Sequence, residues 1–150
     1  TAREILRQTD GRVDAFVAAI GTCGTLVGCA RTLRAHNPAV RVVAVEPRTS
    51  RVIKDGKLIV PIDGPNVAGG LLQEMVNEGF ARDMVHVEQD EAIAMAHRLA
   101  REEGLFCGLS SGANVLAALR VARELKPGQR VVTILVDSRD RYLFKEQLTT

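Results

Sequence analysis

Three segments of the chain are almost continuously apolar, and this pattern predicts buried strands. They are Val13 to Ile20 (VDAFVAAI), Arg41 to Val45 (RVVAV) and Arg130 to Val136 (RVVTILV). Strands buried on both faces carry such runs, whereas a strand with one solvated face alternates apolar and polar residues. The pattern therefore indicates a parallel sheet between two layers of helices.

Elsewhere the apolar positions follow a helical spacing. Helices are predicted over Ala2 to Gln8, Thr25 to His36, Asp90 to Glu103 and Ala113 to Leu125. In the last of these, the expected apolar face is Val115, Leu116, Leu119 and Ala122. Alternating strands and helices predict an α/β fold, a three-layer open and mostly parallel sheet with helices on both faces. The stretch from Pro47 to Gly70 is rich in proline and glycine, and it predicts loop.

Composition narrows the class of protein. The chain has 150 residues, which fit one domain, and a net charge of +2, which is too small to indicate a nucleic-acid partner. No apolar run is long enough for a membrane span, so no membrane partner is expected. Cysteines 23, 29 and 107 are odd in number and lack C-x-x-C spacing, which disfavours a disulfide framework or a zinc site and favours a reducing, cytoplasmic location. Thr1 stands where an initiator Met would, so we expect a longer parent protein.

The first apolar run leads directly into a glycine-rich turn. Val13 to Ile20 is followed by the sequence GTCGT at residues 21–25 and then by a predicted helix. Such a turn presents backbone N–H groups at the positive end of the helix dipole, where phosphate binds well, and threonine hydroxyls add donors. A tight strand-to-helix turn without a ligand fits the bare pattern equally well.

A dinucleotide-binding fold is the main rival interpretation of this turn. Glu46 ends the next strand about where a ribose-binding acid belongs. However, the glycines fall at positions 21, 24 and 28, whereas G-x-G-x-x-G would need glycine at 21, 23 and 26, where Cys23 and Leu26 stand. The spacing therefore disfavours a nicotinamide-binding domain.

A pair of serines follows a second short apolar run, in LFCGLSSGAN at residues 105–114. Ser110 and Ser111 are expected at the carboxyl end of a strand, which is the usual ligand side of an α/β sheet. Either serine can instead cap the following helix through its side-chain oxygen. We expect this capping role of Ser111 more than of Ser110.

Together these motifs resemble those of the cysteine synthase (O-acetylserine sulfhydrylase) and cystathionine β-synthase family of fold-type II pyridoxal-phosphate enzymes. That family has a G-T-G-G-T phosphate cup after a V-D-x-F-V strand, then V/C-G-I-S-S-G-A, and a final strand ending in P-S-G-x-R-Y-L. This chain has VDAFVAAIGTCGT, CGLSSGA and VDSRDRYL in the same order. The stretches QTDG, VVAVEP and EAIAMAHRLAREEG also match, so the resemblance covers essentially the whole chain.

The resemblance implies a cofactor site and a substrate site. The cup for the phosphate of pyridoxal 5'-phosphate would consist of Gly21, Thr22, Cys23, Gly24 and Thr25. Ser110 would hydrogen-bond to the pyridine nitrogen, and a neutral hydroxyl partner leaves that nitrogen largely unprotonated, which suits β-elimination and replacement. The stretch of Ala68, Gly69 and Gly70 resembles the family's G-A-G-F loop near the substrate amino group. Asp137 and Ser138 end the last strand on the cofactor side.

The sequence departs from the family pattern at three places. Cys23 replaces a glycine of the cup, so the cup either avoids a positive φ there or is strained. The thiol of Cys23 is expected to have a lowered pKa, because it lies at a helix amino terminus, and to react when the site is empty. Ala68 replaces a glycine of the substrate loop, and Val136-Asp137-Ser138 replaces Pro-Ser-Gly, so the identity of the substrate is more affected than that of the cofactor.

The family's Schiff-base lysine, and the asparagine loop that holds the substrate carboxylate, belong to an amino-terminal region that this sequence does not contain. The four lysines of this chain lack the family's S-x-K-D-R surroundings and are interpreted as surface residues; they are Lys54, Lys57, Lys126 and Lys145. Residues 1–150 are therefore predicted to be a partial cofactor-binding domain, the carboxy-terminal half of the enzyme, without its catalytic lysine.

The resemblance implies a pyridoxal-phosphate-dependent transferase or lyase as the parent protein. The expected reaction is β-replacement on an activated serine, in which O-acetylserine (or O-phosphoserine) and sulfide give cysteine. Cystathionine synthesis from serine and homocysteine is the close alternative. The chain alone is expected to be inactive, and a truncated domain that holds phosphate without chemistry is a further alternative. Members of the family are commonly dimers, so a homodimer is expected.

Overall fold

The computed structural model describes residues 1–49, 51–59 and 67–142, and its centre is a four-stranded parallel sheet. The strands are β1 (Ala15–Ala19), β2 (Arg41–Pro47), β5 (Met84–Val87) and β6 (Val131–Thr133), in the spatial order β5-β2-β1-β6. The registers pair Val17 with Val43 on one side and with Thr133 on the other. The three apolar runs thus contain neighbouring parallel strands, as predicted. However, β6 ends at Thr133 and not at Val136, so the expectation that Asp137 and Ser138 end the last strand is wrong. β5 is not predicted by the apolar pattern, because it is a half-buried edge strand with His86 in its middle.

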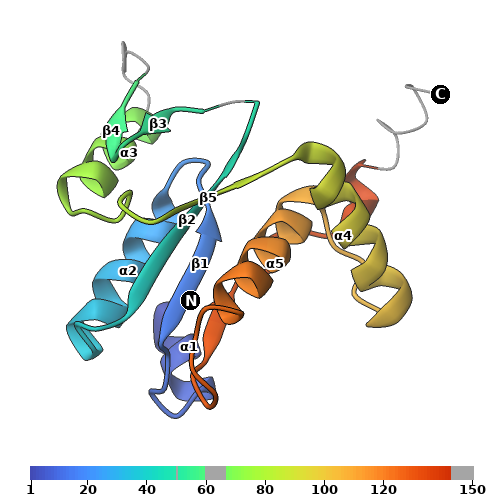
Figure 1. Cartoon of the computed structure of the whole chain (residues 1–150), viewed down its shortest axis with the longest axis horizontal. Helices are drawn as coiled ribbons and strands as arrows, with labels where there is room; N and C mark the ends of the chain where they lie inside the picture. The colour runs from blue at the N-terminus through green and yellow to red at the C-terminus, as the bar shows by residue number, and fades with distance from the viewer. Residues whose placement is uncertain (50, 60–66, 143–150) are drawn as a thin grey trace.

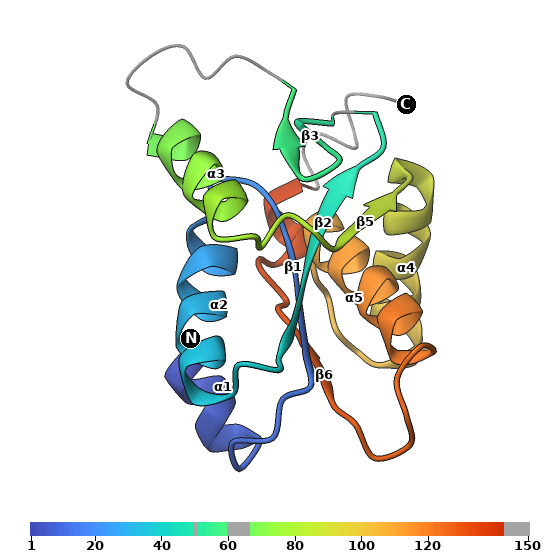
Figure 2. The ribbon, with the colours of Figure 1, turned by 60° about the vertical axis from the view of Figure 1, so that its left-hand side comes forward.

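Helices cover both faces of this sheet, which confirms the three-layer α/β fold (Figure 1). On one side lie α1 (Ala2–Gln8), α2 (Gly24–His36) and α3 (Val67–Asn77), and on the other lie α4 (Gln89–Glu102) and α5 (Leu109–Ala122) (Figure 2). Because successive strand residues point to opposite faces, β1 supplies Phe16 to one core and Val17 to the other. Phe16 lies in a core with Leu33 of α2, and Val17 in a core with Val121 of α5.

The stretch expected to be loop contains two ordered pieces. A small antiparallel hairpin pairs β3 (Ile53–Lys54) with β4 (Lys57–Leu58). Asp55 and Gly56 form its two-residue turn, with φ of 50° and 70°, the combination that an Asp-Gly pair supplies in hairpins. Helix α3 begins at Val67, so Ala68, Gly69 and Gly70 lie in its first turn and the prediction of a loop there is wrong.

The segment around the two serines also differs from its prediction. The run before them forms no strand of the sheet; Cys107 makes only an isolated bridge to Ser138, and α5 begins at Leu109. Ser110 and Ser111 therefore lie inside the first turn of a helix, and their placement at a strand end is wrong. The buried face of α5 is formed by Asn114, Ala117 and Val121, whereas Leu119 is 44% exposed. The predicted apolar face is correct only for Val115 and Leu116, which pack as partly buried residues.

Gly112 allows α5 to pack directly against α4 on the same face of the sheet. A Cβ at this position would lie 2.2 Å from the backbone oxygen of Ala92 and 3.0 Å from the nitrogen of Ala96, both in α4. Only glycine permits this approach. The contact fixes the amino end of α5, and with it both serines.

Among the described residues, no helix is both long and apolar enough to cross a membrane.

Candidate functional site: the edge of the sheet at the amino ends of α2 and α5

The turn between β1 and α2 is a cup of backbone amides and hydroxyl groups. Gly21 and Thr22 follow β1, and Gly24 is the first residue of α2. The first N–H groups of a helix have no acceptor within the helix, and here the helix has neither a side-chain cap nor an acidic residue in its first turn. Thr22 and Thr25 are exposed at this end. The amino end of α2 therefore carries uncompensated positive polarity suited to an anion.

Cys23 occupies the N-cap position of α2 with φ of 64°, in the left-handed region. Of the two alternatives predicted for the cysteine, a positive φ with strain is the one observed. The side chain is buried, and burial raises the pKa of its thiol to about 11. The expectation of a lowered thiol pKa is therefore wrong, because burial disfavours the charged thiolate.

Opposite the cup, the first turn of α5 carries Ser110. Its side chain is half-buried, and its hydroxyl group donates a hydrogen bond to Oδ1 of Asp137 at 3.4 Å. No side chain caps α5, whose N-cap is Gly108, so neither serine has the predicted capping role. Ser111 is fully buried, and its Oγ instead accepts a hydrogen bond from the backbone nitrogen of Val136 at 2.9 Å.

Asn114 joins three segments beneath the site. Its Oδ1 accepts a hydrogen bond from the backbone nitrogen of Ala19 at 2.7 Å, and its Nδ2 donates to the carbonyl oxygen of Ile134 at 2.8 Å. The side chain is buried, so these two bonds tie the end of β1 and the chain after β6 to α5. Sequence reasoning did not identify this residue. In the sequence, Asn114 is marked only by its polar side chain, which stands one turn after Ser111 on the same face of the predicted helix.

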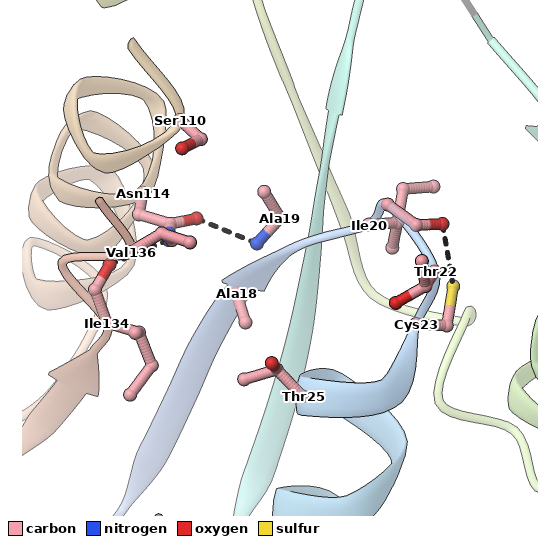
Figure 3. Close-up of a pocket in the computed structure, with 11 residues that line it drawn as sticks. Ala18, Ala19, Ile20, Thr22, Cys23, Thr25, Ser110, Asn114, Ile134 and Val136 are labelled. Atoms are coloured by element: carbon pink, nitrogen blue, oxygen red, sulfur yellow. Dashed lines mark hydrogen bonds between the residues drawn. The ribbon is translucent and has the colours of Figure 1, made fainter. Parts of the chain in front are cut away.

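A cavity of about 270 Å³ lies between the cup and Ser110. Figure 3 shows Thr22, Cys23 and Thr25 on one side of it and Ser110 and Asn114 on the other. Of the residues predicted to bind the cofactor, Gly21, Thr22, Cys23, Thr25 and Ser110 line this cavity. Gly24 belongs to the same turn without lining the cavity. A Cβ there would lie 4.0 Å from Cδ1 of Leu71, so the start of α2 lies close to Leu71 of α3.

Comparison with known proteins gives the family. A sequence model described as "Pyridoxal-phosphate dependent enzyme" matches residues 1–137. A cysteine synthase of Staphylococcus aureus is 37% identical over 148 residues, which cover 95% of this chain and 46% of that protein. The chain belongs to the family of pyridoxal-phosphate dependent enzymes. It spans about half the length of the curated relatives that it matches.

Solved structures of two members of the pyridoxal-phosphate family share this fold. An O-acetylserine dependent cystathionine β-synthase of Helicobacter pylori matches with a TM-score of 0.75 and 34% identity, over 95% of this chain and 46% of that one. An O-acetylserine sulfhydrylase of Entamoeba histolytica matches with a TM-score of 0.79 and 34% identity, over 99% of this chain and 44% of that one. The family model and these two structures confirm the resemblance that was inferred from the motifs.

The cavity fits the cofactor that gives the pyridoxal-phosphate family its name. Pyridoxal phosphate has a dianionic phosphate at one end and an aromatic nitrogen at the other. The cup offers amide and hydroxyl donors without a carboxylate, and Ser110 lies across the cavity from it. Among the described residues, the lining carries no charged side chain, so nothing there repels the phosphate.

Two other groups of residues lie away from this cavity. Lys54 and Lys57 belong to the β3–β4 hairpin, Lys126 follows α5, and none of these three lines it; Lys145 lies outside the described residues. Glu46 is fully buried, and its Oε1 accepts hydrogen bonds from the backbone nitrogens of Val52 and Ile53. It therefore anchors the hairpin, which argues further against a ribose-binding role.

Proposed function

We propose that this chain is the cofactor-binding part of an enzyme that uses pyridoxal phosphate for β-replacement on an activated serine. The reaction we favour makes cysteine from O-acetylserine or O-phosphoserine and sulfide. The observation that carries the proposal is a cavity lined both by the cup at the start of α2 and by Ser110 at the start of α5. Two solved structures with the same fold, an O-acetylserine dependent cystathionine β-synthase and an O-acetylserine sulfhydrylase, support the reaction class.

In this proposal each end of the cavity holds one end of the cofactor. The amides of Gly21 to Thr25 and the hydroxyls of Thr22 and Thr25 bind the phosphate. Ser110 bonds to the ring nitrogen, and Asn114 keeps the strand ends beneath it in place. When bound, pyridoxal phosphate supplies an electron sink that allows a leaving group to depart from the substrate's β-carbon. Ala68, Gly69 and Gly70, in the first turn of α3, are proposed to contact the substrate amino group.

The lysine that carries the cofactor is proposed to come from a part of the enzyme outside residues 1–150. This chain covers 46% of its cysteine synthase relative, which leaves room for a second segment. Residues 1–150 would then form a partial cofactor-binding domain. The homodimer and the cytoplasmic location expected from the sequence stay predictions.

Cystathionine synthesis from an activated serine and homocysteine is the second candidate. The observation that favours it is the 34% identity with the O-acetylserine dependent cystathionine β-synthase over 95% of this chain. Both reactions use the same cup and the same serine. They differ in the thiol, and assays with sulfide and with homocysteine separate them.

The proposal is tested by placing a negative charge in the cup. Gly24→Asp should remove most of the bound cofactor, because a carboxylate beside the phosphate adds repulsion and bulk. Gly28→Asp is the matched control, since Gly28 lies one turn further along α2 on an exposed face with no atom within 4 Å of an added Cβ. After reconstitution and gel filtration, cofactor content is read from visible absorbance. Equal retention in the two variants would move the phosphate site elsewhere.

A further inference from the structure

Another cavity, of about 500 Å³, lies between the β3–β4 hairpin and the chain that leads into β5. We call it the hairpin cavity; its lining includes Arg51, Ile53 and Lys54 from one side and Ala81, Arg82 and Met84 from the other. None of its lining residues lines the cofactor cavity. Its volume is within the range of about 300–1,000 Å³ that is usual for small-molecule sites.

The two walls of the hairpin cavity are fixed relative to each other. The buried carboxylate of Glu46 accepts hydrogen bonds from the backbone nitrogens of Val52 and Ile53, which ties the hairpin to β2. In the hairpin turn, a Cβ on Gly56 would lie 4.0 Å from the carbonyl oxygen of Ala81 on the opposite wall. A cavity that is formed in advance binds a ligand with a smaller loss of conformational entropy.

The exposed part of the lining is positively charged. The side chains of Arg51, Lys54 and Arg82 are exposed, and none of them forms an ion pair within the described part of the chain. They come from both walls, so three cationic groups converge on one cavity. Such an arrangement favours an anion as the ligand.

The acidic residues of the lining do not cancel this charge. Both carboxylate oxygens of Asp83 accept hydrogen bonds from the guanidinium group of Arg41, so this pair is neutral. Asp55 offsets one of the three cations, which leaves two positive charges. The ring of His86 is directed to a carboxylate outside the lining, with Nε2 at 3.3 Å from Oε2 of Glu46. The hairpin cavity therefore suits a doubly charged anion.

The buried part of the same lining is apolar. Ile53 and Ala81 are buried, and Met84 is half-buried. Small-molecule sites combine apolar walls of this kind with a few polar groups that orient the ligand. Arginine binds two phosphate oxygens at once through its planar guanidinium group. The combination fits an organic molecule that carries a phosphate group.

We propose that the hairpin cavity binds a phosphorylated small molecule, at a site separate from that of the cofactor. Arg51, Lys54 and Arg82 bind the phosphate group, whose two negative charges balance the charge of the lining. The organic part of the ligand packs on Ile53 and Met84. This site goes beyond the proposed function, because it requires neither pyridoxal phosphate nor the cup at the start of α2.

The test is a titration of the ¹⁵N-labelled protein with phenyl phosphate at constant ionic strength. At about pH 7.5 a phosphate monoester is largely dianionic. We expect the amide resonances of Gly56 and Ala81 to shift and to reach saturation. The amides of Gly21 and Thr22 report any binding to the cup in the same titration, so the two sites are read separately. Arg82→Glu should weaken binding at the hairpin cavity by at least about tenfold, because a charge-assisted hydrogen bond is lost and repulsion is added.

Lys54→Ala and Lys57→Ala form a matched pair. The two lysines are exposed, and they face each other in the register of the hairpin, but only Lys54 lines the cavity. Lys54→Ala should therefore weaken binding, whereas Lys57→Ala should leave the affinity within about twofold, because solvent and salt screen its charge. This pair keeps the test decisive if Arg82→Glu does not fold.

Three results would overturn the proposal. They are equal weakening by the two lysine variants, shifts of Gly56 and Ala81 that do not saturate, and the absence of shifts at these two amides. Shifts confined to Gly21 and Thr22 would reject the hairpin cavity and leave the proposed function in place. Saturable shifts at Gly56 and Ala81 that are lost in Lys54→Ala support the proposal even if the cup binds no phosphate.

Discussion

Cys23 combines a buried side chain with a backbone conformation that side chains rarely adopt. A left-handed φ costs a residue with a Cβ about 1–2 kcal/mol, and glycine avoids this cost. Cys23→Gly should therefore be more stable than Cys23→Ala by about 1 kcal/mol, although alanine retains more of the buried side chain. Urea unfolding of the two variants measures the difference. An alanine variant as stable as the glycine variant would show that the turn relaxes without strain.

Ser110 and Ser111 are neighbours with different partners, and they should respond differently to the loss of their hydroxyls. Ser111→Ala leaves the backbone nitrogen of Val136 without its acceptor, so we expect unfolding free energy to fall by about 1 kcal/mol. Ser110→Ala should change stability less, because α5 has no side-chain cap to lose. Its effect should appear in the bound cofactor's visible spectrum instead. Urea unfolding and absorbance of both variants provide the comparison, and a reversed pattern would exchange the two assigned roles.

At the scale of helices and strands, local signals decided which elements could be predicted. Helices α1, α2 and α4 follow their predicted bounds within one residue, because their apolar spacing and end residues agree. The start of α5 is four residues earlier than predicted, since Ser-Ser-Gly also suits a loop. The hairpin's Asp55-Gly56 pair was a usable signal, whereas β5 is short and only half-buried and gives no apolar run.

The residues of the candidate site also differ in how far the sequence predicts them. The glycines and threonines of the cup are adjacent along the chain, so their chemistry is visible in the sequence. The hydrogen bonds of Asn114 with Ala19 and of Ser110 with Asp137 arise only when the sheet and α5 pack together. The thiol of Cys23 was misjudged for a related reason, because its burial is a tertiary property.

The contact between α4 and α5 depends on Gly112. Gly112→Ala would place a Cβ 2.2 Å from the backbone oxygen of Ala92, so the helices must separate, and overpacking of this kind costs about 1–3 kcal/mol. We expect the upper part of this range, because the atom struck is backbone. Gly28→Ala in α2 is the control; a Cβ there meets nothing within 4 Å, and it should stabilise the protein by roughly 0.5–1 kcal/mol. Thermal unfolding of both variants measures the effects, and a neutral Gly112→Ala would contradict this close packing of α4 and α5.

At the scale of the whole molecule, part of the apolar surface near the site is uncovered. Leu105, Phe106, Leu135 and Val136 are each more than 40% exposed. They belong to the segments that flank the first turn of α5, next to Ser110 and Asp137. Because the chain spans about half the length of its relatives, we propose that further protein covers this surface in the complete enzyme.

The chain of 150 residues should bind the cofactor without forming cysteine. The described lining of its cavity has no charged side chain that could move a proton, and Lys54, Lys57 and Lys126 lie elsewhere. Covalent catalysis on pyridoxal phosphate requires a lysine at the cofactor. The assay mixes the loaded protein with O-acetylserine and sulfide and measures cysteine, with the cysteine synthase of Staphylococcus aureus as the active reference. Bound cofactor in the visible spectrum shows that an inactive sample is correctly loaded. Cysteine formation at a rate near that of the reference would mean that residues 1–150 hold a complete active site, and the proposed division of the enzyme would then be wrong.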